Sequence, residues 1–219
     1  GPAAFSDVVN PMLAKQTQGL KQSCGIVLID FAGSADGRTL IDNLILSNQP
    51  KPVAMPLRFK EGKLKIAQLT DVHWTPGSEK SEKGNPETIL KVLDMEKPDV
   101  VILTGDVVTS KPAKEGWKHI VEMMETAGVP FAVTMGNHDA ENWSEDSIYN
   151  YLSKSRLFIG KKGPEALSGT GNYILPVYAS DGTDKINALL YCMDSNDYTA
   201  DAEKYGNYAW IDWGQIAWY

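Results

Sequence analysis

Histidine and cysteine are scarce in this chain. Its 219 residues include three histidines, His73, His119 and His138, and two cysteines, Cys24 and Cys192. Two cysteines are too few for a disulfide framework, and nothing beyond their number supports a bridge between them. The length and the 42% hydrophobic content are nevertheless enough for one domain with a substantial core.

Long apolar runs and an excess of positive charge are also missing. No run approaches the ~20 apolar residues of a membrane-spanning helix. No signal peptide is visible at the start, although Gly1-Pro2 is compatible with a leader that has been removed. The net charge of −7 argues against a broad nucleic-acid-binding face. It leaves phosphorylated substrates open, because bound cations can reverse the local potential.

Three short polar motifs, each directly after an apolar run, stand in the middle of the chain. The apolar runs are Leu64–Thr70, Val100–Thr104 and Phe131–Met135. The motifs that follow them are Asp71-Val72-His73, Gly105-Asp106 and Gly136-Asn137-His138-Asp139. Short runs rich in β-branched residues and bounded by Pro, Gly and charge predict buried strands.

Helical patterns separate these predicted strands. Asn85 is expected to cap the first helix, with Pro86 at its first position. The second helix is indicated by apolar residues at a 3.6-residue period, namely Trp117, Ile120, Val121 and Met124. Alternating strands and helices predict parallel β-α-β units, in which functional groups gather at the carboxyl ends of the strands. The three motifs are therefore expected to converge in space.

The residue types of the motifs suit a metal site. Asp71 and Asp106 offer anionic oxygens, His73 offers an imidazole, and Asn137 offers an amide oxygen. This mixture favours Zn, Mn, Fe or Mg over Cu(I) or an iron–sulfur cluster, which prefer thiolates. One carboxylate can bridge two cations. Two ions about 3.5–4 Å apart clamp a phosphoryl group and lower the pKa of a bound water from about 15.7 toward about 7.

The order D-x-H, G-D and G-N-H-D, each after a predicted strand, resembles the calcineurin-like metallophosphoesterases, which include purple acid phosphatases and many phosphodiesterases. The resemblance runs from about Leu57 to Tyr219. It implies an α/β fold, a β-sandwich of mostly parallel strands flanked by helices. It implies that Asp71 and His73 bind a first metal and that Asp106 bridges to a second. By the same resemblance, Asn137 binds the second metal, His138 faces the leaving group, and Asp139 orients His138.

The sequence departs from this family in its histidines. The family places a further ligand histidine and a G-H-x-H after these motifs, and neither follows Asp139 here. The chain ends at Tyr219 inside a predicted helix, so we expect the fold to be incomplete at the C-terminus. Thr109 stands where purple members carry a tyrosine, which favours a generic Mn, Zn, Fe or Mg pair over a purple iron site.

The first 56 residues do not fit the family pattern. Gly25–Phe31 predicts a strand, and Pro50, Pro52 and Pro56 mark a connector. We therefore divide the chain into an N-terminal segment, residues 1–56, of unassigned role, and residues 57–219 as the N-terminal part of a catalytic domain.

The C-terminal half predicts a third helix from Ser144, a hairpin of Asn172–Val177 and Ala188–Met193, and a last helix with a capping box of Asp212 and Gln215. The final stretch is rich in aromatic residues: Tyr205, Tyr208, Trp210, Trp213, Trp218 and Tyr219. We expect these in the core or an interface, with a pocket for an aryl leaving group as the alternative. His119 is expected on the solvated side of its helix.

Two functions follow from these observations. The first is a metal-dependent phosphatase or phosphodiesterase that uses two divalent ions and a bridging hydroxide on a phosphorylated small molecule. The second, suggested by the missing histidines, is a truncated or degenerate member that acts as a non-catalytic binding or structural module. An incomplete sheet would expose apolar surface, so we expect an oligomer or a second fragment that supplies strands and histidines. The resemblance favours a periplasmic or secreted protein over a cytoplasmic one.

Overall fold

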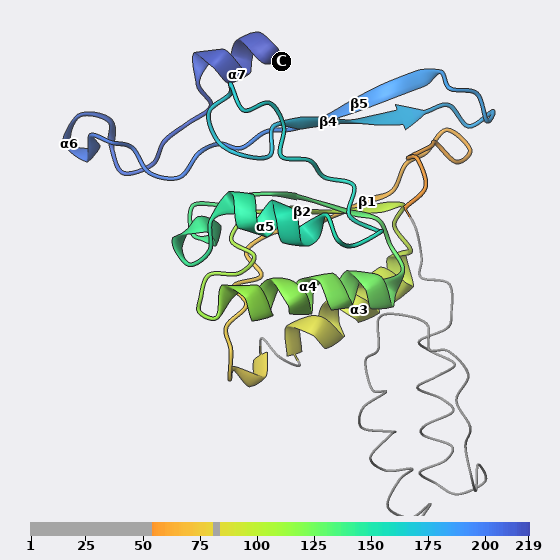
Figure 1. Ribbon diagram of the computed structural model, residues 1–219. Helices are drawn as coiled ribbons and strands as arrows, with labels where there is room; N and C mark the ends of the chain where they lie inside the picture. The colour runs from red at the N-terminus through yellow and green to blue at the C-terminus, as the bar shows by residue number, and fades with distance from the viewer. Residues whose placement is uncertain (1–53, 81–83) are drawn as a thin grey trace, which may run out of the picture. The chain divides into compact units, whose positions relative to one another are not determined.

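The computed structural model describes residues 54–80 and 84–219, which belong to a compact unit that begins at Pro52 (Figure 1). The predicted strand Gly25–Phe31 and Cys24 lie outside the described residues. None of the described helices is long and apolar enough to cross a membrane.

A three-stranded parallel sheet carries the motifs. Its strands are β1 (Ile66–Leu69), β2 (Val100–Thr104) and β3 (Phe131–Thr134), in the order β1-β2-β3. The register pairs Leu69 with Leu103 and Leu103 with Val133, so the three strands end close together. The predicted strands and their parallel β-α-β connections are confirmed, and β2 and β3 are largely buried as expected. The expected burial is wrong for β1, whose residues are alternately exposed and half-buried.

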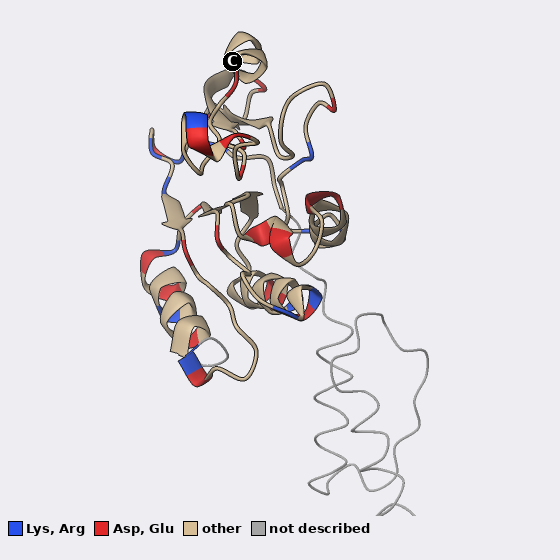
Figure 2. Ribbon diagram, turned by 90° about the vertical axis from the view of Figure 1, so that its left-hand side faces the viewer, with Lys and Arg blue, Asp and Glu red and all other residues tan. Residues whose placement is uncertain are grey.

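Helices α3 (Asn85–Glu96) and α4 (Ala113–Ala127) lie together on one face of this sheet (Figure 1). The apolar stripe predicted for α4 is buried, and charged residues occur along both helices (Figure 2). The predicted cap of α3 is wrong by one residue: Gly84 is the N-cap. The side chain of Asn85 instead donates to the carbonyl of Val72 and so ties the helix to the first motif.

An antiparallel hairpin of β4 (Tyr173–Tyr178) and β5 (Ile186–Cys192) lies on the opposite face of the parallel sheet (Figure 1). Four shorter elements complete the described fold: η2 (Asp139–Glu141), α5 (Glu145–Leu152), α6 (Ala202–Tyr205) and α7 (Trp213–Trp218). The predicted cap of α5 at Ser144 and the capping box of α7 are both confirmed. The architecture is α/β, as expected.

Two buried tyrosines, Tyr149 of α5 and Tyr173 of β4, bind the edge of the parallel sheet. The hydroxyls of Tyr149 and Tyr173 both donate to the carbonyl oxygen of Val133 at 2.8 Å. The Tyr173 hydroxyl also accepts the backbone N–H of Val133 at 3.1 Å. Because β3 has no strand partner on this side among the described residues, these side chains satisfy backbone groups that would otherwise be buried without partners.

Candidate metal centre

Backbone hydrogen bonds hold the first two motifs side by side beyond the ends of β1 and β2. The N–H of Asp71 donates to the carbonyl of Gly105 at 3.1 Å, and the N–H of His73 donates to the carbonyl of Asp106 at 3.0 Å. The predicted convergence of these motifs at the carboxyl edge of the sheet is therefore present in the fold.

The second and third motifs approach each other through their glycines. A Cβ atom on Gly105 would lie 2.9 Å from the Cα of Gly136, closer than real Cβ contacts allow. A Cβ atom on Gly136 would collide with the carboxylate and backbone nitrogen of Asp106. Glycine at both positions is what lets the loop that carries Asn137 and His138 contact the loop that carries Asp106.

Asp139 fastens the same two loops. Its side chain is completely buried, and Oδ1 accepts the backbone N–H groups of Val107 and Val108 at 2.9 and 3.0 Å. Its Oδ2 accepts the N–H of Gly136 at 2.9 Å. Burial raises the pKa of this carboxyl, although the three donors favour the charged form. The carboxylate that contacts the His138 ring belongs to Glu141 instead.

Asp71, His73 and Asp106 form a compact ligand set. One ligand atom from each lies within 4.8 Å of the other two. The Nε2 atom of His73 is 3.5 Å from Oδ1 of Asp71 and 3.8 Å from Oδ2 of Asp106. These separations are longer than good hydrogen bonds and fit atoms that converge on a cation between them. The donor set of two carboxylates and an imidazole fits a divalent ion.

The backbone of this set is strained. Asp71, His73 and Asp106 have φ angles of +53°, +50° and +49°, in the left-handed region that non-glycine residues avoid. Each such residue costs on the order of 1 kcal/mol or more, and such strain clusters at functional sites. Three strained residues that point their side chains at one place support a functional role for that place.

The electrostatics of the ligand set favour a bound cation. A hydrogen bond from Thr70 is the main reason why the pKa of Asp71 is lowered, with a smaller contribution from His73. The side chains of Asp71 and His73 are 62% and 50% exposed, whereas that of Asp106 is 16% exposed. The site therefore offers two carboxylates and an imidazole and is open to a ligand from solvent.

Asn137 and His138 lie beside this set. The backbone N–H of His138 donates to Oδ1 of Asp106 at 3.1 Å, and the centroid of its ring is 6.4 Å from that of His73. The Asn137 side chain donates through Nδ2 to the hydroxyl of Tyr198 at 3.0 Å. The three loops thus bring together all of the residues predicted for the site, namely Asp71, His73, Asp106, Asn137, His138 and Asp139.

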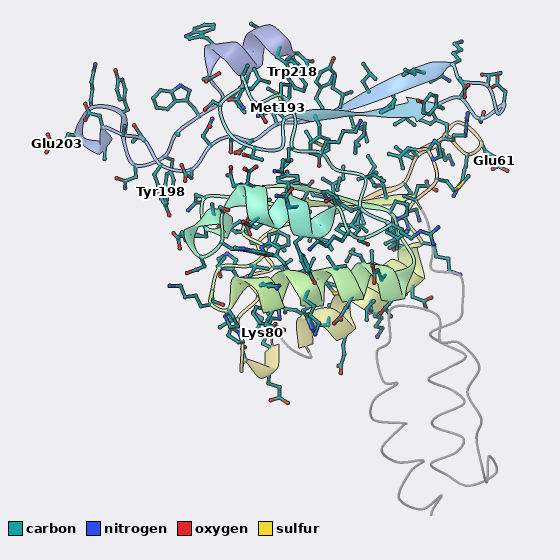
Figure 3. All side chains as sticks on the ribbon, in the orientation of Figure 1. Glu61, Lys80, Met193, Tyr198, Glu203 and Trp218 are labelled. Carbon is teal, nitrogen blue, oxygen red and sulfur yellow. The ribbon has the colours of Figure 1, made fainter. Side chains whose placement is uncertain are left out.

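Sequence reasoning missed two residues at this site, Glu141 and Tyr198. Oε1 of Glu141 lies 2.7 Å from Nδ1 of His138 and accepts the hydroxyl of Tyr198 at 3.0 Å. The hydrogen bond with Glu141 raises the pKa of His138, and the bonds from His138 and Tyr198 lower the pKa of Glu141. Tyr198 comes from the loop after β5, far from the motifs in sequence (Figure 3).

Two predictions outside the motifs need correction. His119 is half-buried: its ring lies 6.2 Å from that of Trp74, and its Nε2 has no hydrogen-bond partner among the described residues. The loop after the first motif covers part of this side of α4, so the residue is only partly exposed. The C-terminal aromatics were expected in the core or an interface; the core does not apply to the residues that are more than half exposed, and an interface stays a prediction for them. They are Tyr205, Tyr208, Trp210, Trp213 and Tyr219.

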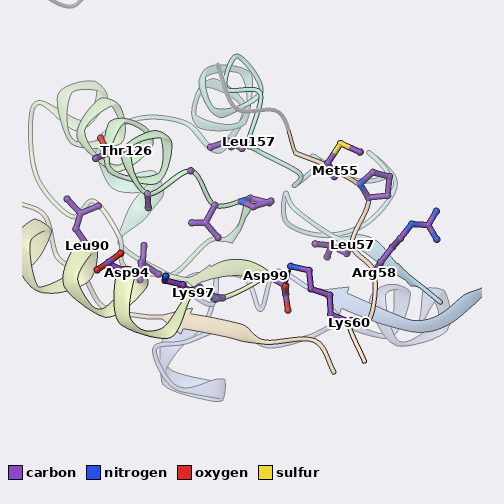
Figure 4. A pocket seen from close by; sticks show the side chains of 17 residues that line it. Met55, Leu57, Arg58, Lys60, Leu90, Asp94, Lys97, Asp99, Thr126 and Leu157 are labelled. Carbon is purple, nitrogen blue, oxygen red and sulfur yellow. Dashed lines mark hydrogen bonds and ion pairs between the residues drawn. The ribbon is translucent and has the colours of Figure 1, made fainter. Parts of the chain in front are cut away.

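A cavity of about 830 Å³ lies at the other edge of the sheet (Figure 4). Its walls include Asp99, which directly precedes β2, and Pro130, which directly precedes β3. The motifs follow the opposite ends of these strands. This cavity is therefore separate from the candidate metal centre.

Comparisons with known proteins agree with this geometry. Residues 64–212 match the family model described as Calcineurin-like phosphoesterase. Phosphatase DCR2 of Saccharomyces cerevisiae is 31% identical over 172 residues, which are 69% of this chain and 30% of that protein. Two Arabidopsis thaliana proteins, named Probable inactive purple acid phosphatase 29 and 28, are 28% and 26% identical. These matches cover 74% and 75% of this chain, but 48% and 49% of the plant proteins, so the chain spans less than half of each relative.

Proposed function

Because the chain belongs to the calcineurin-like phosphoesterase family, we propose that residues 57–219 are the N-terminal part of a catalytic domain that hydrolyses phosphoric esters with two divalent metal ions. One observation carries the proposal: ligand atoms of Asp71, His73 and Asp106 lie within 4.8 Å of one another at the carboxyl edge of the parallel sheet. Functional groups gather at this edge in α/β folds.

The family resemblance implies the ligand roles. Asp71 and His73 would hold the first ion, Asp106 would bind both ions, and the amide oxygen of Asn137 would bind the second. Two divalent ions, of Mn, Zn, Fe or Mg, would supply Lewis acidity toward the phosphoryl oxygens and would make hydroxide available as the nucleophile at neutral pH.

The remaining residues of the site act on the phosphoester itself. His138, beside the ligand set, donates a proton or a hydrogen bond to the leaving oxygen. Asp139 keeps the loop of His138 against that of Asp106 through its three backbone partners. The half-exposed Asp71 and His73 leave the site accessible to a phosphorylated small molecule, either a monoester or a diester.

The test combines metal content with hydrolysis. The full chain is loaded with Mn²⁺, gel-filtered and analysed for bound metal, and it is then assayed with p-nitrophenyl phosphate and bis-p-nitrophenyl phosphate. We expect two ions and hydrolysis that Asp106→Asn abolishes when an oligomer or a second fragment supplies the missing histidines, and little or no turnover from these 219 residues without such a supplement. Asp184→Asn, which removes an equal charge from a 95% exposed side chain, is the control and retains activity. Hydrolysis that survives Asp106→Asn would refute the proposal.

A second candidate function is a non-catalytic module that binds metal weakly. It is favoured by the small number of histidines, three in the chain, and by the word inactive in the names of the two plant relatives. The same experiment separates the two functions. One weakly held ion and no turnover with either ester, even with the missing histidines supplied, favour the module, whereas two ions with turnover favour the hydrolase.

An oligomer or a second fragment remains part of the proposal. Apolar side chains are exposed on both sheets: Ile66 of β1 is 40% exposed, and Ile186 and Leu189 of β5 are 50% and 45% exposed. Apolar surface of this kind favours association. We expect light scattering of the full chain to give a mass above that of one copy, and a monomer would contradict this expectation.

A periplasmic or secreted location likewise stays a proposal, supported by the family resemblance. Fractionation of cells that express the native gene tests it, with activity or antibody signal expected outside the cytoplasm.

A further inference from the structure

Four side chains at the edge of the candidate metal centre form one continuous hydrogen-bonded series. Nδ2 of Asn137 lies 3.0 Å from the hydroxyl oxygen of Tyr198, which lies 3.0 Å from Oε1 of Glu141. The same Oε1 lies 2.7 Å from Nδ1 of His138. Two members, Glu141 and Tyr198, belong to none of the three motifs.

The direction of every hydrogen bond in the series is fixed by its chemistry. An ionised carboxylate only accepts, so Glu141 receives a proton from Nδ1 of His138 and another from the hydroxyl of Tyr198. The Tyr198 hydroxyl has one proton, which is used on Glu141, so it accepts from Asn137. The Asn137 side chain must therefore present its NH₂ group to Tyr198.

This arrangement leaves two atoms available for the reaction. Because the NH₂ group of Asn137 is bonded to Tyr198, its Oδ1 takes no part in this series. An amide oxygen is the atom of asparagine that binds cations. Because Nδ1 of His138 is bonded to Glu141, Nε2 on the opposite side of the ring takes no part in this series. A histidine that acts at a site is typically oriented by a bond to its other ring nitrogen.

We propose that Glu141 and Tyr198 are positioning residues: Glu141 holds His138 through Nδ1 so that Nε2 faces the phosphoester, and Tyr198 holds Glu141 and turns the Asn137 oxygen toward the metal. The catalytic meaning of this arrangement rests on the proposed hydrolase function. Its geometry rests on the contacts alone and is testable without turnover.

The first test measures the tautomer of His138 by long-range ¹H–¹⁵N NMR of the full chain. Only three histidines contribute signals, and His138→Asn assigns the relevant one. At about pH 9, where a histidine side chain is neutral, we expect His138 to carry its proton on Nδ1 in the wild type. A wild-type proton on Nε2 would overturn the proposal.

Substitution of Glu141 sharpens this test. Glu141→Ala removes the acceptor, so His138 shifts to the Nε2–H form that a free histidine side chain prefers. Glu141→Gln keeps a carbonyl acceptor and retains the Nδ1–H form. Glu203→Ala, at an exposed position of α6, is the control and leaves the spectrum unchanged (Figure 3). An unchanged His138 tautomer in Glu141→Ala would contradict the proposed contact.

Tyr198→Phe tests the other end of the series and does not depend on Glu141→Ala being folded. Loss of a residue that orients a metal ligand weakens metal binding by about tenfold or more, so we expect at least that loss for Mn²⁺. Tyr208→Phe removes a hydroxyl from the ring that stacks on Tyr198 at 6.1 Å and serves as the matched control. Equal Mn²⁺ affinity in Tyr198→Phe and Tyr208→Phe would overturn the role of Tyr198.

The rate of hydrolysis on two different esters provides a last test, because a purely structural role of Glu141 would lower both rates equally. A proton donor matters most for poor leaving groups, so Glu141→Ala is expected to lose about tenfold more rate on an alkyl phosphoester than on a p-nitrophenyl ester. Equal losses on both esters would contradict positioning. If the wild type hydrolyses neither ester, the hydrolase proposal fails, and the tautomer of His138 still decides the positioning proposal.

Discussion

The Oδ1 atom of Asp139 lies 2.9 Å from the backbone nitrogen of Val107. This bond connects the loop after β3 to the loop after β2, and the other two bonds of the carboxylate strengthen the connection. The distance between Asp106 and the pair Asn137 and His138 therefore depends on a fully buried residue that bonds only to backbone N–H groups. Asp139 acts on the site through the backbone of both loops.

Two replacements of Asp139 should lower the free energy of unfolding by different amounts. Asp139→Ala leaves three N–H groups without acceptors, two buried and one part-buried, each costing about 1–3 kcal/mol, so we expect a loss of more than 3 kcal/mol in the free energy of unfolding. Asp139→Asn keeps one oxygen for Val107 and Val108 but presents NH₂ to Gly136, so its loss should be smaller. Urea unfolding monitored by circular dichroism measures both, and equal losses would contradict the assigned bonds.

The sequence predicted the parts of the fold that local patterns determine. The strand Val100–Thr104 appears within its predicted limits, and the period of Trp117, Ile120 and Met124 identified the buried side of α4. Parallel strands with motifs at their carboxyl ends were enough to place Asp71, His73 and Asp106 together. These inferences depend on strand period and connection rules, which are properties of short segments.

Contacts between distant segments were not predictable in the same way. Tyr198 reaches Asn137 from a loop after the hairpin, and no spacing in the sequence links the two residues. Glu141 had a weak signal, because a residue three positions after His138 in a helical turn lies on the same side. His119 was misplaced because the helical period does not reveal that the loop carrying Trp74 covers the polar side of α4.

Divalent metal should stabilise the fold through Asp71, His73 and Asp106, independently of any turnover. A ligand that binds only the folded state at 100 times its dissociation constant adds about 2.7 kcal/mol. We expect Mn²⁺ or Zn²⁺ to raise the melting temperature of the wild type and EDTA to reverse the increase. His73→Ala and Asp71→Asn should lose most of this increase, while Asp181→Asn, at an exposed turn, should keep it. A metal-induced increase that survives both site substitutions would place the ion elsewhere.

Gly116 in α4 should resist replacement by alanine, against helix propensity. Alanine is favoured over glycine by about 1 kcal/mol in a helix. Here, however, the new Cβ would lie 2.5 Å from Cγ1 of Val108 and 2.6 Å from Cε3 of Trp74. Both neighbours are buried, and overpacking of this kind costs about 1–3 kcal/mol. We therefore expect net destabilisation in thermal unfolding, whereas the exposed Thr126→Ala on the same helix should change stability little.

Asp99 should make folding stability depend on pH in the acid range. Its side chain is 14% exposed. It accepts a hydrogen bond from Nζ of Lys60 at 2.5 Å and another from the backbone N–H of Lys65 at 2.8 Å. Burial raises its pKa, but these two donors outweigh burial, so the pKa of folded Asp99 lies below the unfolded value. A carboxyl group with a lowered pKa stabilises the fold above its unfolded pKa, and this contribution disappears as the pH falls through the folded pKa.

The variant Asp99→Asn tests this dependence directly. At about pH 7 it should cost about 1–3 kcal/mol, the range for a hydrogen bond to a charged group, and the difference from wild type should shrink toward zero below about pH 3. Urea unfolding at a series of pH values measures the difference. Asp184→Asn, which breaks a 3.3 Å ion pair between Arg58 and an exposed carboxylate, should show only a small, nearly flat difference. A difference for Asp99→Asn that stays constant from neutral to acid pH would mean that the lost charge contributes nothing, and that the cost comes from packing around the start of β2.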